Sequence, residues 1–169
     1  PMPAFANNSL FTDITLMSQT GYIDVERDFV DFNIQKLLPH KYSESGPAMA
    51  VADLDGNHLD DFVLGGSYGH SAMIFLQQNN GSFQKKELIP GGTDFTKPWE
   101  DAGIVLFDAD KDGDIDIYIA SGGYENTANT KSYADNLFVN DGKGGFYKDA
   151  AALPVNLTSK SCVRAVDYD

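Results

Sequence analysis

The chain has 169 residues, 42% of them hydrophobic and 12% aromatic, so it is long enough for one domain with a buried core and is not expected to be disordered. Its 25 Asp and Glu outnumber its 12 Lys and Arg, and the formal charge of −13 argues against a nucleic-acid partner and favours cations. The apolar runs are too short to span a bilayer, and the single cysteine, Cys162, excludes an intrachain disulfide.

Residues 1–46 are expected to form a lead-in segment with the first strands. The alternation of Phe-Thr-Asp-Ile-Thr over residues 11–15 predicts a strand, and residues 34–38 suggest one turn of helix. No segment shows a long apolar period of 3.6 residues, whereas glycine, proline, Asn and Asp supply many turns. The sequence therefore predicts an all-β chain.

Acidic clusters recur along the chain. Residues 50–66 and 105–123 superimpose, and residues 163–169 begin a third copy; the first aspartates are Asp53, Asp108 and Asp167, 55 and 59 residues apart. After each complete cluster comes an apolar run, then an Asn-Gly or Asp-Gly turn at residues 79–81 or 140–142, and then a short strand led by an aromatic residue. Such a turn between apolar runs predicts a β-hairpin.

Each repeat thus holds four short strands, which is the content of one β-propeller blade. The predicted organisation is a lead-in (1–46), a first repeat (47–101), a second repeat (102–160) and the start of a third (161–169). A ring needs at least four blades, or roughly 230 residues at this repeat length, so we expect a fragment of a larger propeller of four-stranded antiparallel sheets.

The acidic loops have the spacing of metal ligands. Side-chain oxygens fall at relative positions 1, 3, 5 and 9, and a backbone carbonyl is expected at position 7. In the second repeat these residues are Asp108, Asp110, Asp112, Asp114 (carbonyl) and Asp116, with Gly113 at position 6. In the first they are Asp53, Asp55, Asn57, Leu59 (carbonyl) and Asp61, and in the third repeat Asp167 and Asp169.

All-oxygen sites rich in carboxylates favour Ca²⁺ as the bound ion. In the first loop His58 replaces the glycine at position 6, which is expected to add backbone strain that Gly56 eases. An EF-hand is disfavoured because Leu64 and Ile119 stand where its last acidic ligand would be. The other interpretation, aspartates clustered in ordinary surface turns, is weakened by two loops with identical spacing.

The two loops, with the Phe-Val-Leu-Gly-Gly and Ile-Tyr-Ile-Ala-Ser-Gly-Gly runs that follow them, resemble FG-GAP or VCBS repeats, the calcium-loop blades of integrin α-subunits and many bacterial surface proteins. Residues 31–41, 136–142 and 161–165 are similar to the bacterial group that also carries an ASPIC/UnbV domain. The resemblance implies calcium in the blade loops, export to the cell surface, outer membrane or medium behind a signal sequence, and no established catalytic activity.

We therefore expect a secreted or cell-surface calcium-binding module that binds protein or glycan, or takes part in an outer-membrane complex. The alternative is the propeller part of an enzyme acting on polysaccharide, which needs a pair of carboxyl groups outside the calcium loops. The available residues show no spacing typical of such a pair; they are Glu26, Glu44, Glu87, Glu100 and Glu125. A calcium-driven conformational switch is a third hypothesis, disfavoured because blade loops are rigid.

Overall fold

The computed structural model describes residues 10–41, 43 and 46–166, and these form two four-stranded sheets with three short helical turns. The first sheet holds β1 (Met49–Ala52), β2 (Asp61–Leu64), β3 (Met73–Gln77) and β4 (Phe83–Glu87). The second sheet holds β5 (Glu100–Phe107), β6 (Asp116–Gly122), β7 (Asn136–Asn140) and β8 (Phe146–Asp149). The helical turns are α1 (Thr15–Ser18), η1 (Asp31–Asn33) and η2 (Lys131–Tyr133).

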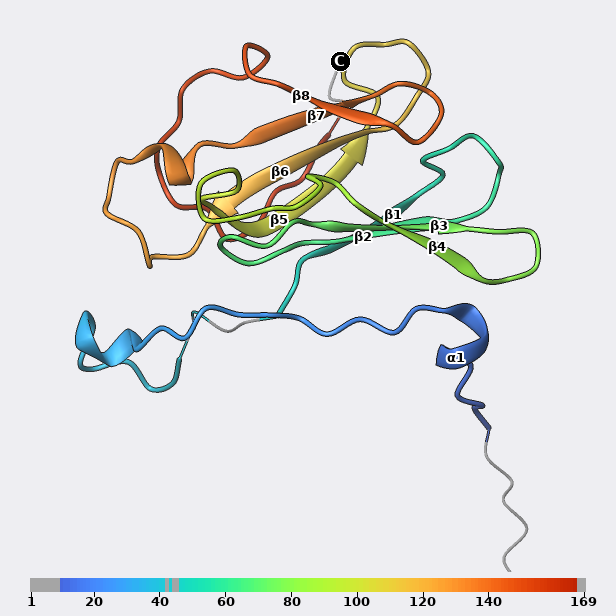
Figure 1. Cartoon of the computed structure of the whole chain (residues 1–169). Coiled ribbons are helices and arrows are strands. Elements are labelled where there is room, and N and C mark those ends of the chain that lie inside the picture. The colour runs from blue at the N-terminus through green and yellow to red at the C-terminus, as the bar shows by residue number, and fades with distance from the viewer. Residues whose placement is uncertain (1–9, 42, 44–45, 167–169) are drawn as a thin grey trace, which may run out of the picture.

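Both sheets are antiparallel meanders in which each strand pairs with its neighbour in sequence (Figure 1). The predicted turns join β3 to β4 and β7 to β8. The all-β prediction is confirmed, and the two sheets have the form of propeller blades. Within the described residues, no helix is long and apolar enough to cross a bilayer.

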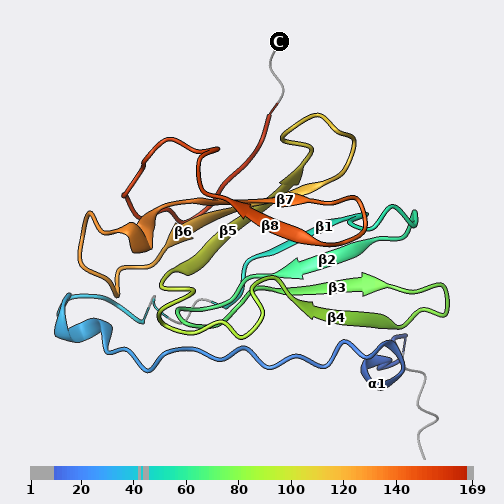
Figure 2. The same cartoon turned by 45° about the horizontal axis from the view of Figure 1, so that its top comes forward.

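The core lies between the two sheets. Val63 pairs across the first sheet with Ile74, and Ile117 pairs across the second with Phe138; all four side chains are buried in one hydrophobic cluster with Trp99. Because side chains alternate along a strand, each sheet presents one apolar face to the other. Full burial of side chains of this size stabilises by about 1.5–3 kcal/mol each, so the two blades hold each other in place (Figure 2).

The first strands of the two sheets, β1 and β5, contact each other (Figure 2). Met49 and Val51 of β1 are 58% and 53% exposed, although strand residues of this type are usually covered. Two blades cannot close a propeller, which needs at least four. This edge is therefore where the fold leaves room for further blades.

The lead-in segment differs from the prediction. Residues 10–41 contain no strand: the strand expected over 11–15 is replaced by a bend followed by α1, and the expected helical turn at 34–38 is displaced to η1. The segment runs along the face of the first sheet that points away from the second sheet (Figure 1). There the ring of Tyr22 packs edge-on against the ring of Phe75, with 6.3 Å between the ring centroids. Phe11 and Ile14 are exposed, and residues 11–15 pair with none of the described strands, so the alternating pattern alone does not produce a strand there.

Beyond the second blade, residues 161–166 run close to β5. A parallel bridge joins Gly122 to Lys160, and a side chain at Gly103 would meet the backbone of Cys162 and Val163. Residues 161–166 form no strand themselves, so the start of a third repeat stays a prediction. The predicted ligands Asp167 and Asp169 lie outside the described residues.

Candidate metal centres

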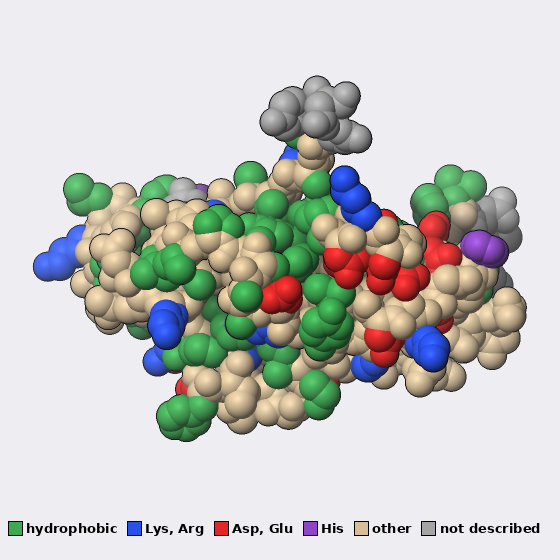
Figure 3. Space-filling model, turned by 90° about the horizontal axis from the view of Figure 1, so that it is seen from above, with side chains coloured by type: hydrophobic (Ala, Val, Ile, Leu, Met, Phe, Trp, Pro, Cys, Tyr) green, Lys and Arg blue, Asp and Glu red, His purple; other side chains and the backbone are tan. Residues whose placement is uncertain are grey.

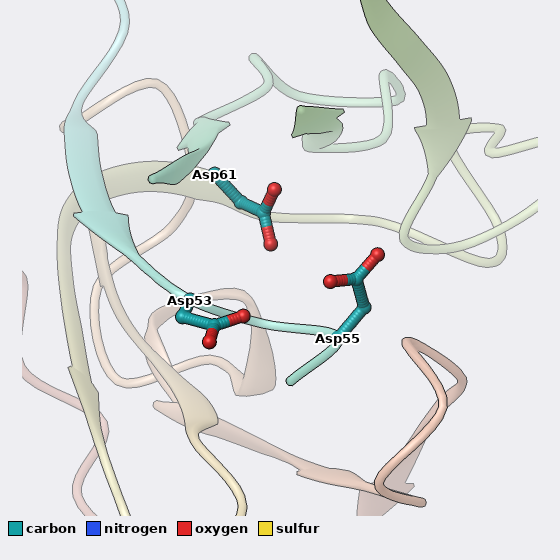
Figure 4. Close-up of side chains that lie close together, drawn as sticks. All are labelled: Asp53, Asp55 and Asp61. Carbon is teal, nitrogen blue, oxygen red and sulfur yellow. The ribbon is translucent and has the colours of Figure 1, made fainter. Parts of the chain in front are cut away.

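The two acidic loops occupy equivalent places, residues 53–60 between β1 and β2 and residues 108–115 between β5 and β6. Acidic side chains gather toward the right-hand end of Figure 3, the end at which both loops lie in Figure 1. In each loop three carboxylates offer oxygens within 4.8 Å of one another. They are Asp53, Asp55 and Asp61 in the first loop (Figure 4), and Asp108, Asp110 and Asp116 in the second.

The carboxylate at position 1 organises the first loop by accepting backbone N–H groups. Asp53 accepts from Asn57 at 3.1 Å and from His58 at 2.8 Å. Asp55, at position 3, accepts the N–H of Asn57 at 3.2 Å. The Asn57 side chain in turn accepts the N–H of Leu59 at 2.7 Å. Each ligand position therefore also fixes the backbone a few residues further on.

The second loop repeats these bonds. Asp108 accepts the N–H groups of Lys111 at 2.6 Å and Gly113 at 3.0 Å. Asp110 accepts the N–H of Asp112 at 3.2 Å, and Asp112 accepts that of Asp114 at 2.9 Å. In the first loop the N–H of Gly56 also donates to Asp53, at 2.8 Å, so in both loops positions 4 and 6 donate to position 1, position 5 to position 3, and position 7 to position 5. The bond from Asn57 to Asp53 has no counterpart among the bonds of the second loop. The shared bonds therefore belong to the repeat and not to one sequence.

The carboxylates at position 9, Asp61 and Asp116, are fully buried and tie each loop to its blade. One oxygen of each accepts a loop N–H, and the other accepts an N–H at the end of the third strand. The donors are Leu54 (2.8 Å) and Gln77 (2.6 Å) for Asp61, and Ala109 (2.7 Å) and Asn140 (2.8 Å) for Asp116. A buried N–H without an acceptor costs about 1–3 kcal/mol, so these carboxylates are structural as well as candidate ligands.

One carboxyl group in each cluster, Asp61 in the first and Asp110 in the second, has a raised pKa. Burial raises the pKa of Asp61, and the negative charges of Asp55 and Asp53 raise it further. Desolvation also raises the pKa of Asp110, and the charge of Asp112 adds to the effect. A cation between these groups would relieve the repulsion.

Asp112, predicted at position 5, is not part of the second group of three carboxylates, and Asn57 stands at that position in the first loop. The Asn57 amide donates to the carbonyl of Gln77 at 2.9 Å, and its oxygen is used by Leu59. At position 7, Leu59 and Asp114 were predicted to bind through their backbone carbonyls and not through their side chains. The side chain at position 5 accepts the backbone N–H of this residue in each loop, which helps to fix the backbone at position 7.

Both loops have left-handed backbone at two positions, 4 and 6. At position 6 these residues are His58 (φ 65°) and Gly113 (φ 98°), and at position 4 they are Gly56 (φ 74°) and Lys111 (φ 68°). Each loop therefore has glycine at one such position and a larger residue at the other. The sequence indicated left-handed backbone at position 6 but not at position 4, although Gly56 stands at position 4 of the first loop.

Asn140 is a buried residue whose role the sequence did not reveal. Its amide nitrogen donates to the carbonyls of Leu54 (2.8 Å) and Ile115 (2.9 Å), and its oxygen accepts the N–H of Gly142 at 3.0 Å. Leu54 belongs to the first acidic loop and Ile115 to the second. Asn140 thus holds the two candidate centres in a fixed relation.

Lys97, in the connection between the blades, is also buried and was missed. Its ammonium donates to the carbonyls of Gly66 (2.5 Å), Ser67 (2.8 Å) and Trp99 (2.8 Å), and lies 3.2 Å from an Asp101 carboxylate oxygen. Burial lowers the pKa of Lys97 while the charge of Asp101 raises it. Three carbonyl acceptors match the three N–H groups of an ammonium, and through them Lys97 links the end of β2 to the start of β5.

Comparison with known protein families supports the repeat assignment. Residues 53–119, which include both acidic loops, match the family model of the FG-GAP-like repeat. No curated protein and no solved structure matches the chain. The match covers the first acidic loop through most of β6 and does not extend to the features that resemble the ASPIC/UnbV group.

Proposed function

We propose that the chain is a calcium-stabilised, non-catalytic β-propeller module that binds protein or glycan. The observation that carries the proposal is the pair of loops with one hydrogen-bond pattern, each bringing three carboxylates within 4.8 Å. An accidental surface cluster has no reason to repeat position by position in a second blade.

The donor chemistry fits calcium. Carboxylate and carbonyl oxygens are the ligands of hard cations, and Ca²⁺ accepts six to eight of them in flexible geometry. The three carboxylates of each group would hold the ion, with the position-5 side chain and the position-7 carbonyl completing its shell. In the third repeat Asp167 and Asp169 would begin an equivalent site.

The ion would act as a structural brace. It would offset the negative charges that raise the pKa of Asp61 and of Asp110. It would also link each loop to its buried carboxylate at position 9, Asp61 or Asp116, which already accepts an N–H from the third strand. An ion bound only by the folded state stabilises that state by mass action.

We further propose that the protein is exported, to the cell surface, the outer membrane or the medium. Extracellular modules hold calcium with dissociation constants of about 10⁻⁴–10⁻³ M, which suits loops that are largely open to solvent. The ASPIC/UnbV-like features of residues 31–41 support a bacterial source of this kind, with a surface protein, a glycan or an outer-membrane complex as partner.

Thermal unfolding with and without calcium tests the proposal. The melting temperature is expected to rise on addition of Ca²⁺ at about 10⁻³ M to chelator-treated protein and to fall again with excess chelator. Mg²⁺ at the same concentration should have a smaller effect, because it demands octahedral geometry and keeps its waters. A melting temperature that changes with neither calcium nor chelator would contradict the proposal.

A further inference from the structure

An open hollow of about 400 Å³ lies at the end of the blades away from the acidic loops. Three segments that are distant in the sequence line it: residues 34–35 after η1, the loop from Gly123 to η2, and residues 157–159. Figure 1 shows the first two segments at its left-hand side, whereas the acidic loops lie at the right. The strand β6 separates the hollow from the second acidic loop by roughly 20 Å, at 3.3 Å per residue.

The loop from Gly123 to η2 is held in one conformation by its own hydrogen bonds. The hydroxyl of the buried Tyr133 donates to the carbonyl of Asn126 at 2.9 Å and accepts the N–H of Asn126 at 3.3 Å. The hydroxyl of Thr130 donates to the carbonyl of Thr127 at 2.9 Å, which closes the turn between them. The backbone that carries the wall of the hollow is therefore fixed before any ligand arrives.

The other two segments are fixed as well. The hydroxyl of Ser159 donates to the carbonyl of Gly123 at 2.5 Å and ties the third segment to the loop. The N–H of Gln35 donates to the carbonyl of Asp31 at 2.9 Å, and Asp31 is itself fully buried. A wall that is already ordered saves the entropy that a ligand would otherwise spend on ordering it.

The hollow is lined by uncharged side chains. None of the described residues that line it is Asp, Glu, Lys, Arg or His, although Asp, Glu, Lys and Arg together make up 22% of the chain. An anion is bound most strongly by basic donors, and a cation by carboxylates or other negative groups. The wall therefore suits a neutral ligand.

Three side-chain amides line the hollow, and they belong to Gln35, Asn126 and Asn129. Within the part of the chain that the structure describes, none of these amide groups forms a hydrogen bond. Each amide has two N–H donors and an acceptor oxygen, and a sugar hydroxyl likewise donates and accepts. An apolar peptide side chain would cover the amides and leave them without water, which is costly. The amides thus favour a ligand with several hydroxyl groups.

Tyr124 and Leu157 add an apolar surface to the hollow. The ring of Tyr124 is held edge-on by the ring of Phe29, with 5.8 Å between the ring centroids. Trp99, the single tryptophan, is 5% exposed and leaves the aromatic contact to tyrosine. The negative face of an aromatic ring attracts the C–H groups on the face of a sugar ring, whose hydroxyls then point outward to the amides. The volume lies within the usual range for small-molecule sites, about 300–1,000 Å³.

We propose that this hollow binds a neutral sugar unit of a glycan, with Tyr124 against the sugar ring and the amides of Gln35, Asn126 and Asn129 bonded to its hydroxyl groups. The inference rests on the binding role proposed above and names a neutral glycan as the ligand. It does not require calcium, because the hollow and the acidic loops lie at opposite ends of the blades.

Titration followed by ¹H–¹⁵N correlation spectra of the calcium-loaded chain tests the inference, because each side-chain amide gives its own signals. The neutral probes are maltotriose, cellotriose, mannotriose and galactotriose. Trigalacturonic acid is the charged comparison, and acetyl-Leu-Leu-amide represents an apolar peptide. At least one neutral trisaccharide is expected to shift the amide signals of Gln35, Asn126 and Asn129 in a saturable way. Its affinity should change less than about twofold between about 0.05 and 0.5 M salt, because no charged group takes part.

Variants of the wall should weaken this binding. Asn126→Ala keeps the backbone bonds to Tyr133 and should lose about two- to tenfold in affinity, and Gln35→Ala, at an exposed position, should lose a similar amount. Tyr124→Leu removes the aromatic face and should lose about tenfold, whereas Tyr124→Phe keeps the ring and most of the affinity. Asn79→Ala, in the exposed turn between β3 and β4, is the matched control and should bind as the wild type does.

Three results would overturn the inference. They are no saturable shift with any of the four neutral trisaccharides, tighter binding of trigalacturonic acid or the peptide, and wild-type affinity in folded Gln35→Ala and Tyr124→Leu. Circular dichroism establishes that each variant is folded. Melting with and without calcium on the same samples reports calcium stabilisation separately, so failure of this inference is distinguished from failure of the calcium proposal.

Discussion

The two acidic loops reach the same geometry with different residues. The first has Gly56 at position 4, Asn57 at position 5 and His58 at position 6, whereas the second has Lys111, Asp112 and Gly113 at these positions. What they share is aspartate at positions 1, 3 and 9 and the backbone bonds those side chains accept. The comparison teaches that the carboxylates define the loop, and that a single glycine, at either left-handed position, is enough.

The largest effect is expected at position 9, where the two loops are most alike. Asp61→Ala and Asp116→Ala each leave one buried and one partly buried N–H group without an acceptor. The free energy of unfolding in chelator should therefore fall by about 1–6 kcal/mol in either variant. Urea denaturation measures this free energy. A loss below about 1 kcal/mol in either variant would show that the carboxylate is not the structural tie described here.

Asn140 and Gln77 stand at the same place in the two blades but differ in role. Asn140→Ala removes the side chain that joins the two loops and should lower the free energy of unfolding by about 1–3 kcal/mol. Gln77 contacts the first loop through its backbone N–H and carbonyl, so the free energy of unfolding of Gln77→Ala should stay within about 0.5 kcal/mol of the wild type. Equal effects in urea denaturation would contradict this asymmetry.

Position 3 separates calcium binding from folding. Asp55 and Asp110 each accept an N–H at 3.2 Å, which Asn can also accept. Asp55→Asn or Asp110→Asn should therefore leave the melting temperature in chelator unchanged. Either variant should lose the stabilisation that calcium gives through one site, about 1.4 kcal/mol when the free Ca²⁺ concentration is ten times the dissociation constant.

The control for position 3 is Asp60→Asn, which removes the same charge from an exposed residue of the first loop outside the group of three. It should keep most of the calcium-induced rise in melting temperature. If Asp60→Asn loses as much of that rise as Asp55→Asn, then net charge and not the geometry of the group governs the response.

The smallest effect concerns the left-handed residues that are not glycine. His58→Gly and Lys111→Gly should raise the free energy of unfolding by about 0.5–1 kcal/mol, because a side chain at positive φ is strained. Gly113→Ala should lower it by a similar amount. Differential scanning calorimetry resolves such shifts, and no gain in either glycine variant would mean that the loops carry no strain at these positions.

Much of the fold could be predicted from the sequence because the signals are local. The hairpin turns, the alternating strands and the spacing of Asp53, Asp55 and Asp61 all act within a few residues of one another. The strand predicted at residues 11–15 was wrong because alternation alone does not supply a strand edge to pair with.

The roles of Asn140 and Lys97 could not be predicted for a related reason. Asn140 contacts Leu54, 86 residues earlier, and Lys97 contacts Gly66, 31 residues earlier. Neither residue carries a local motif that indicates its partner, because those partners come together only when the two blades pack. The hydrogen bonds that the carboxylates at position 9 accept from the third strand could not be predicted either, because their donors are 16 and 24 residues away in the sequence.

Counting the calcium ions bound by the folded chain tests the central claim most directly. Calorimetric titration of chelator-treated protein with Ca²⁺ is expected to give two sites, with one lost in Asp55→Asn, the other lost in Asp110→Asn, and both retained in Asp60→Asn. Absence of calcium binding at millimolar concentration, or two sites persisting in the Asp55→Asn/Asp110→Asn double variant, would contradict the account.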